Sequence, residues 1–391
     1  MTTHSPPYTY SLSQRSVFQR TIILLQNYLE HLGYRPQIHF EVEGCYQVDG
    51  ISNYKEQQLD YSIINKHLHR LNIDGEIVTE YWQNQWEYVS LFNGQSPLKE
   101  AENLSNALEK IPQLFSQLYA KSTLIQPVVW CGDKGKLADG SEQIFSHDTR
   151  SVHIPNAVQL NVSVLNSKGE NLIVDDEFGK YLQQCFLQTS LECCLFYLPE
   201  GAAFERLALK TRYGLVQELC SPVDISGGHQ GSVALYKELG KHNQKMGEQP
   251  LLYDQHHCVL SSVHNWQKTA RIEHRLGASS LSYNPYLNVI YGLLNIVDAV
   301  NAYEQNELLI EKEFVPIGLP TSLYTDQTAV GAIELFQQST WFNHSLNAVQ
   351  KKYNRLKLVP VLDCSIQLGD KIKEAILANY HLVLSNTKRI N

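Results

Sequence analysis

The sequence predicts an α+β fold in which helices pack against a sheet. The chain has 391 residues, of which 43% are hydrophobic, so it can bury a substantial core. Apolar residues recur at helical spacing in some segments and alternate with polar residues in others. Because these two patterns interleave along the chain, a mixed sheet flanked by helices is expected.

Residues 1–16 are expected to form a flexible arm, and residues 17–391 a single domain with a helical C-terminal part. Gly33 ends the first expected helix, and Asn284 before Pro285 opens a later one. The expected helices span residues 17–32, 54–71, 97–119, 178–196 and 285–303. The expected strands span residues 37–47, 76–79, 86–92, 161–165, 170–173, 232–236 and 271–276.

Composition excludes several classes of protein. The net charge is -8, and the sequence has no cluster of Lys or Arg that could bind a phosphate backbone. Nucleic acid is therefore not an expected partner. No apolar run of about 20 residues and no apolar leader is present, so no membrane partner and a cytoplasmic location are expected. The eight cysteines are scattered, which indicates neither a disulfide framework nor a metal knuckle.

One short pattern is FEVE, in which Phe40 and Val42 alternate with Glu41 and Glu43. In a strand this alternation points both carboxylates to one face. Taken alone, a half-buried strand with one solvated side is the more common interpretation of such a pattern.

Five longer segments appear in the order in which the glutamine synthetase family has them. ARIEHRLGASSLSYNPYLNVIYGLLNIVDAV, at residues 270–300, resembles that family's A-R-(I)-E-x-R followed by N-P-Y-L. The others are GYRPQIHFEVEGCY, TEYWQNQWEY, SVLNSKGENLI and GLPTSLYTDQTAVGAIELFQQSTWF. The chain therefore resembles the catalytic domain of the glutamine synthetase family over residues 34–342.

This resemblance implies a curved, mostly antiparallel sheet that forms a half-barrel flanked by helices. It also implies ATP as co-substrate, Mg²⁺ or Mn²⁺ as the metal ion, and a small carboxylate or amine as substrate. The residues before Glu41 are too few for the small β-grasp domain that completes a neighbour's site in the family. A homo-oligomer stays open, but the conventional dodecamer is not expected from this chain alone.

By motif match, the first metal ion would be bound by Glu43, Glu80 and Glu87. Carboxylate oxygens are the ligands that Mg²⁺ prefers. Residues 82–84 replace the glycines and proline of the family loop, so the loop backbone is expected to differ. In isolation this segment is more often an acidic surface hairpin; beside the other motifs we favour metal binding.

The second metal ion would be bound by Glu41, Glu273 and a histidine, according to the same resemblance. The two histidine positions of the family carry Gln159 and Asn161 instead. The Gln159 carbonyl is a neutral hard oxygen that can coordinate Mg²⁺, so a weakened second site is expected.

The resemblance places cations near the transferring phosphoryl group. Lys268, Arg271 and Arg275 match basic family positions and are candidates for binding phosphate or substrate, and Arg206 matches a further arginine. The alternative is that both strand arginines pair with Glu273 across the sheet face.

Other family positions are lost. Gly231 and Tyr236 stand where two arginines contact phosphate and the substrate carboxylate, and residues 155–157 replace a G-S-G turn. Because those glycines let substrate approach the backbone, the usual glutamate pocket is not expected.

Three functions are consistent with this pattern. The first is an ATP- and Mg²⁺-dependent carboxylate-amine ligase with an altered substrate, acting through an acyl phosphate. The second is a catalytically degenerate homologue that acts in binding or assembly. The third is transfer of a phosphoryl or nucleotidyl group to a protein.

Overall fold

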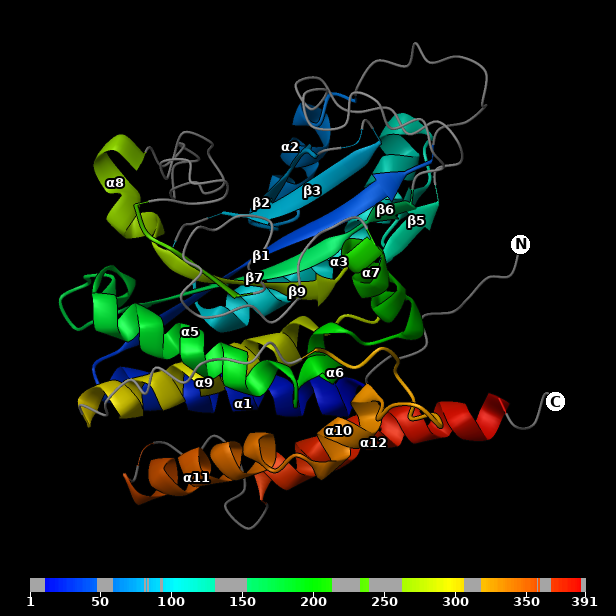
Figure 1. The fold of residues 1–391 in the computed structure, drawn as a ribbon. Coiled ribbons are helices and arrows are strands. Elements are labelled where there is room, and N and C mark those ends of the chain that lie inside the picture. The colour runs from blue at the N-terminus through cyan, green and yellow to red at the C-terminus, as the bar shows by residue number, and fades with distance from the viewer. Residues whose placement is uncertain are drawn as a thin grey trace.

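The computed structural model arranges the chain in layers, with the sheet on one side and helices beneath it (Figure 1). It describes residues 11–47, 59–80, 82, 84–91, 94–130, 153–212, 233–238, 262–305, 318–356, 358 and 367–387. The middle layer holds α1 (Leu12–His31), α3 (Pro97–Tyr119), α5 (Asp176–Ser190), α6 (Cys194–Tyr197) and α9 (Pro285–Glu304). The outer layer holds α10 (Ala332–Gln338), α11 (Trp341–Arg355) and α12 (Leu368–Thr387). The remaining helices are α2 (Ser62–Arg70), α7 (Gly201–Arg212) and α8 (Ser262–Thr269).

The main sheet is antiparallel and open, with strand order β2-β3-β1-β7-β9-β8 and β4 paired to β1. Its strands are β1 (Arg35–Tyr46), β2 (Gly75–Thr79), β3 (Gln85–Ser90), β4 (Thr123–Leu124), β7 (Ala157–Leu165), β8 (Val233–Tyr236) and β9 (Arg271–Ala278). A separate pair is formed by β5 (Val128–Trp130) and β6 (His153–Pro155). The expected mixed antiparallel architecture is confirmed, although the sheet is uncurled and does not form the expected half-barrel.

Helix α9 is the centre of the core. It is buried along most of its length, because it lies between the sheet and the neighbouring helices. Gly292 brings its backbone close to the sheet, where an added Cβ would lie 3.2 Å from Ile38 and 3.6 Å from Leu160. Ile38, Phe40 and Val42 of β1 therefore face the core, and Glu41 and Glu43 face away.

One expected boundary and one expected strand are corrected. The first helix begins at Leu12, inside the expected arm, because Ser11 and Gln14 form a capping box. The expected strand at residues 170–173 is wrong: Leu165 and Asn171 form an isolated bridge, and a 3₁₀ turn, Leu172–Val174, follows.

Other elements differ more modestly from expectation. The helix expected over residues 178–196 is divided into α5 and α6, and α7 and α8 were not expected. Helix α2 begins at Ser62; residues 54–58 of the expected helix lie outside the described part. Within the described ranges, no helix is both long enough and apolar enough to cross a membrane.

His274 lies on the core face of β9 and is almost fully buried. Its ring packs against Phe186, Tyr197 and Tyr291, and Nε2 lies 3.2 Å from the Ser190 hydroxyl. Burial lowers the pKa of His274 from 6.5 to about 3, so the folded chain keeps this imidazole neutral.

His274→Leu is expected to make stability less dependent on pH. As pH falls from 6.5, the unfolded chain binds a proton that the folded chain does not, so the free energy of unfolding falls by up to ~1.4 kcal/mol per pH unit. Urea unfolding between pH 5 and 7 measures this slope. Equal slopes for the wild type and the variant would contradict a neutral buried His274.

Candidate functional site

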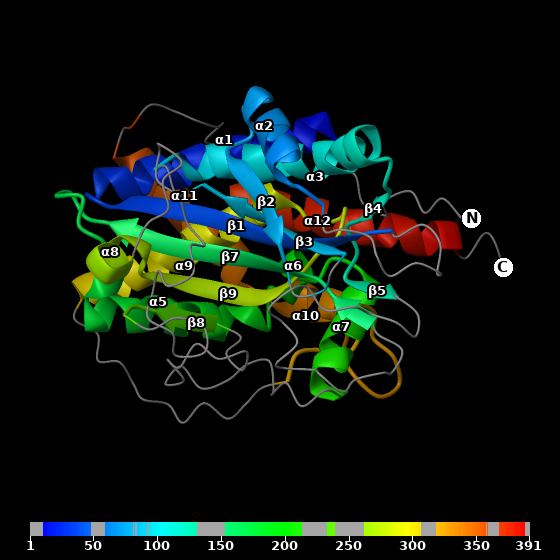
Figure 2. The same cartoon turned by 90° about the horizontal axis from the view of Figure 1, so that it is seen from above.

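Strand pairing gathers acidic side chains on the face of the sheet that points away from α9. Figure 2 looks onto this face. Glu41 is opposite Gln159 across β1 and β7, and Glu43 is opposite Glu87 across β1 and β3. Directly opposed residues share a face of a sheet. The carboxylates of the FEVE strand thus meet partners from both neighbouring strands.

The β7 and β9 strands extend this face. Asn161 is opposite Glu273, and Tyr236 on the edge strand β8 is opposite Arg271. Sequence reasoning placed Asn161 and Tyr236 by motif but gave neither a role in the site. The alternation of Gln159, Asn161 and Ser163 with apolar residues in β7 was the signal that marks a polar face.

Gln159 lies between Glu41 and Glu273. Its amide nitrogen is placed toward the two carboxylates, because its oxygen would otherwise face only acceptors. In this orientation it donates to Glu273 Oε1 at 2.6 Å and to Glu41 Oε2 at 3.1 Å. In this orientation the amide nitrogen faces both acids, and the carbonyl that was expected to bind a metal ion points away from them.

Arg271, on β9, contacts side chains from three other strands. Its Nη2 donates to Glu273 Oε2 at 2.9 Å, and its Nε donates to Asn161 Oδ1 at 2.7 Å. Nη2 also lies 3.9 Å from Glu41 Oε1, and the guanidinium stacks 5.1 Å from the centre of the Tyr236 ring. Of the two alternatives for Arg271, pairing with Glu273 is the one the structure contains.

Arg275 pairs with the same carboxylate, with Nε 3.3 Å from Glu273 Oε1. Burial would lower the pKa of Arg275, but nearby Tyr236 and the Glu273, Glu41 and Glu43 carboxylates raise it above its ordinary value. The guanidinium stays charged among these acids. Burial, followed by the charge of Glu273, raises the pKa of Tyr236, which keeps the phenol neutral.

The Glu43 side of the face has a different balance of charge. Glu43 Oε2 accepts from the Ala157 backbone N–H at 2.8 Å and from Gln85 Nε2 at 3.4 Å. Glu87, only 5% exposed, stands directly opposite. Like charges directly opposed across strands are destabilising. A cation between the two carboxylates would relieve that repulsion, so this position fits a divalent ion.

Glu80, the third expected ligand of the first ion, follows the end of β2 and is half-buried. Its backbone N–H donates to the Gln85 carbonyl at 3.3 Å. Across the described ranges, no three His, Cys, Asp or Glu side chains converge closely enough to hold a metal ion. Mg²⁺ is usually bound by one or two carboxylates together with water and substrate phosphates, so the Glu43–Glu87 pair alone suits it.

Lys268 lies on the last turn of α8, exposed at the edge of the site. It lines a pocket of about 460 Å³ whose other walls include Gln37, Asn171 and Gln267. Gln37 is on the same side of β1 as Glu41, about 13 Å away along the strand. The pocket therefore opens at one end of the acidic face.

Arg206 bonds to the backbone of β9 far from Arg271. It is 2% exposed on α7, and its Nη1 donates to the Leu276 carbonyl at 3.3 Å. Leu276 is about 17 Å along β9 from Arg271. The structure thus brings Arg271 and Arg275 together on Glu273, leaves Lys268 at the edge, and bonds Arg206 to the backbone next to Arg275.

Asn156 fills the position of the lost glycine turn. It is fully buried, accepts from Gln85 Nε2 at 3.0 Å, and donates to the Gln126 carbonyl at 3.0 Å. Its backbone carbonyl accepts from the Ser279 N–H at 3.1 Å. A side chain tied on several sides occupies space that a glycine would leave open. Gly231, the other departure noted in the sequence, lies outside the described residues.

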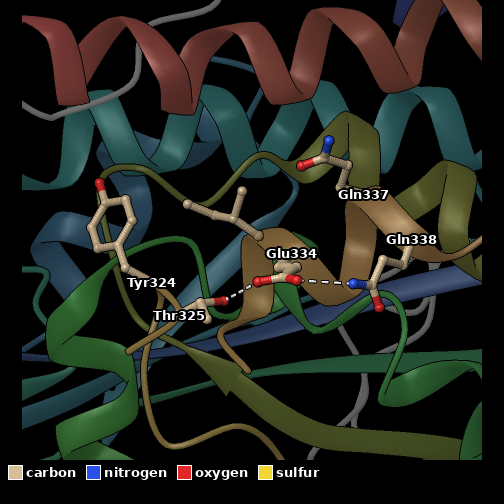
Figure 3. A pocket seen from close by; sticks show the side chains of 6 residues that line it. Tyr324, Thr325, Glu334, Gln337 and Gln338 are labelled. Atoms are coloured by element: carbon tan, nitrogen blue, oxygen red, sulfur yellow. Dashed lines mark hydrogen bonds between the residues drawn. The ribbon is translucent and has the colours of Figure 1, made fainter. Parts of the chain in front are cut away.

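A second pocket, of about 560 Å³, lies at α10 (Figure 3). Its Glu334 accepts from Thr325 Oγ1 at 2.6 Å and from Gln338 Nε2 at 2.9 Å. It is lined by residues on the helical side of the molecule, apart from the acidic face. Its Thr325, Glu334 and Gln338 side chains are thus joined by hydrogen bonds.

Arg271→Met is expected to destabilise the fold by about 3–5 kcal/mol, because it leaves Glu273 and Glu41 buried with one guanidinium fewer. Arg355→Met, at an exposed position on α11, is the matched control and should cost less than about 1 kcal/mol. Urea unfolding measures both. Combining Arg271→Met with Glu273→Gln should cost less than the sum of the single changes, and strict additivity would argue against a coupled pair.

The sequence and the structure were compared with known proteins. No protein-family model matches the sequence, and no curated protein is significantly similar to it. The structure is similar to a crystal structure described as a novel glutamine synthase homolog, with a TM-score of 0.56 and 15% identity over 95% of this chain and 71% of that one.

Two structures of the protein GmaS are also similar. GmaS without ligand gives a TM-score of 0.52 and 12% identity over 93% of this chain and 73% of that chain. A complex of GmaS with ADP gives a TM-score of 0.51 and 11% identity over 87% and 73%. At these identities the likeness establishes the fold alone. The chain has the fold of glutamine synthetase homologues.

Proposed function

We propose that this chain is an ATP- and Mg²⁺-dependent ligase that joins a small carboxylate to an amine through an acyl phosphate. The observation that carries the proposal is the Glu43–Glu87 pair, two opposed carboxylates on the open face of a glutamine synthetase-like sheet. The resemblance of the surrounding motifs to that family supplies the reaction type.

The metal ion would be held by Glu43 and Glu87, with Glu80 at the edge as a further ligand. When bound, the ion would neutralise charge on the triphosphate and on the transferring phosphoryl group. Gln85 and the Ala157 N–H orient Glu43 through Oε2, which leaves Oε1 for a cation. The protein thus supplies preset ligands, and water or phosphate oxygens would supply the rest.

The nucleotide would enter from the pocket beside Lys268. Its volume of about 460 Å³ is within the usual range for small-ligand sites. The ADP complex of GmaS supports nucleotide binding by a protein of this fold.

The reaction needs two displacements. A substrate carboxylate oxygen attacks the γ-phosphorus, and ADP leaves; the amine nitrogen then attacks the acyl carbon, and inorganic phosphate leaves as the nitrogen loses a proton. Arg275 stays charged next to Glu43 and can steady the phosphoryl oxygens during both steps.

A substrate other than glutamate is proposed because the groups that would grip glutamate have changed. Asn156 fills the turn that glycines would leave open, and Tyr236 packs on Arg271 where a family arginine would stand. Both changes remove contacts for a second carboxylate and leave the metal-binding pair in place.

One observation favours the alternative of a non-catalytic binding or assembly protein. Both strand arginines are paired with Glu273, so neither guanidinium is wholly committed to phosphate. A protein of this kind would bind nucleotide without turning it over.

ADP formation from ATP and Mg²⁺, measured over a panel of carboxylates and amines, tests the proposal. Glu43→Gln and Glu87→Gln should each lower the rate by about 100-fold or more, because each removes a charged ligand of the phosphoryl-bearing ion. Glu109→Gln, at an exposed position on α3, is the matched control and should leave the rate unchanged.

A thermal shift with ATP and Mg²⁺ but no ADP from any substrate pair would support the binding alternative. If ATP with Mg²⁺ gives no thermal shift and no ADP forms, both the ligase and the binding alternative are overturned. Turnover that survives Glu43→Gln and Glu87→Gln would show that another group binds the nucleotide's ion.

A further inference from the structure

Every carboxylate oxygen of Glu41 and Glu273 already accepts a hydrogen bond or an ion pair. Glu41 Oε1 accepts from Asn161 Nδ2 at 2.9 Å, and Glu41 Oε2 from the Gln159 amide at 3.1 Å. Glu273 Oε1 accepts from the same amide at 2.6 Å, and Arg275 lies 3.3 Å away. Glu273 Oε2 accepts from Arg271 at 2.9 Å. Each of the four carboxylate oxygens of Glu41 and Glu273 therefore already has a donor.

Charge is balanced at this position as well. Two carboxylates, Glu41 and Glu273, face the guanidinium groups of Arg271 and Arg275, and all four residues are buried. A divalent ion added here would leave two positive charges in excess inside the protein. Repulsion between charges is strong where water is largely excluded, so such an ion would be bound poorly.

We propose that Gln159, with Arg271 and Arg275, takes the place of a divalent cation between Glu41 and Glu273. The chain then binds one catalytic ion, at Glu43 and Glu87. This inference rests on the proposed function, since it concerns the ions that would serve it.

The type of side chain at position 159 decides the matter. A metal ligand must present a lone pair to the ion, and a glutamine could do so only through its carbonyl oxygen. With the carbonyl turned inward, both Glu41 and Glu273 would lose a donor and face a third acceptor. The amide nitrogen instead carries two hydrogens, one for each acid, and bridges them as an ion would.

The contrast with the neighbouring pair supports the assignment. Glu43 and Glu87 stand opposite each other, and the donors to Glu43 given by Gln85 and Ala157 are neutral. On the β1–β3 side, therefore, one carboxylate directly opposes another, whereas on the β7–β9 side each carboxylate faces donors. A cation is expected between carboxylates that oppose each other directly.

Counting bound Mn²⁺ by equilibrium dialysis, without ATP, tests this. The wild type should bind one ion per chain. Glu87→Gln should weaken its binding by at least about 10-fold, and Glu273→Gln, the same change on another strand of the same face, should leave its affinity little altered. Gln159→Glu replaces the bridging donor by a third carboxylate and should add a second ion.

Two ions in the wild type, with one lost in Glu273→Gln, would overturn the inference, and so would no bound ion at all. If Gln159→Glu or Glu273→Gln does not fold, the number of ions bound by the wild type and by Glu87→Gln still tests the inference. The outcome is separable from the ligase reaction: one ion without ADP formation upholds this inference and rejects the proposed function, whereas two ions with ADP formation do the reverse.

Discussion

Strand β1 lies between β3 and β7, and the hydrogen bonds on both of its sides fix which residues face the helices. Phe40 and Val42 are buried on the core side, and Glu41 and Glu43 lie on the other. A slip of one residue would exchange the two sets, placing two carboxylates against α9 and two apolar side chains in the site. The hydrophobic core therefore holds the acidic face in position, and any chemistry there depends on packing beneath it.

The buried carboxylates in the two halves of that face have different kinds of partner. Burying carboxylates is costly unless each is paired and hydrogen-bonded. Around Glu273 the partners are protein groups, with Arg271 and Arg275 supplying charge and Gln159 supplying donors. Around Glu87 the directly opposed residue is another carboxylate. A cation bound between Glu43 and Glu87 would relieve the repulsion between these opposed carboxylates.

Local signals in the sequence predicted much of the fold. Helix α3 has the expected bounds, because Ser96 caps it and Pro97 suits its first turn. The expected strand at residues 170–173 failed, because Asn166 Oδ1 accepts from the Lys168 and Glu170 N–H groups and closes a local turn in place of a ladder. In a sequence, a turn closed by a side chain that bonds backbone N–H groups looks the same as the turn of a β-hairpin.

The acidic residues of the site were also accessible from the sequence, but their grouping across strands came from the family resemblance and not from the pattern of any one strand. Alternation marks which residues of one strand share a face, as it did for Glu41 and Glu43. It does not say which strand lies alongside. Tyr236 stacks on Arg271 only because β8 pairs with β9, and that pairing joins segments separated by a long stretch of chain.

The substrate side and the metal side of the site are coupled through one carboxylate. The Ala157 N–H, next to the buried Asn156, donates to Glu43, and Gln85 bonds to both Glu43 and Asn156. A glycine at position 156 would free the Gln85 amide and loosen the turn that presents the Ala157 N–H. Replacing the glycine turn therefore does more than fill a pocket. It fixes the orientation of Glu43, so a change in what the chain accepts as substrate is also a change in how firmly its metal ligand is preset.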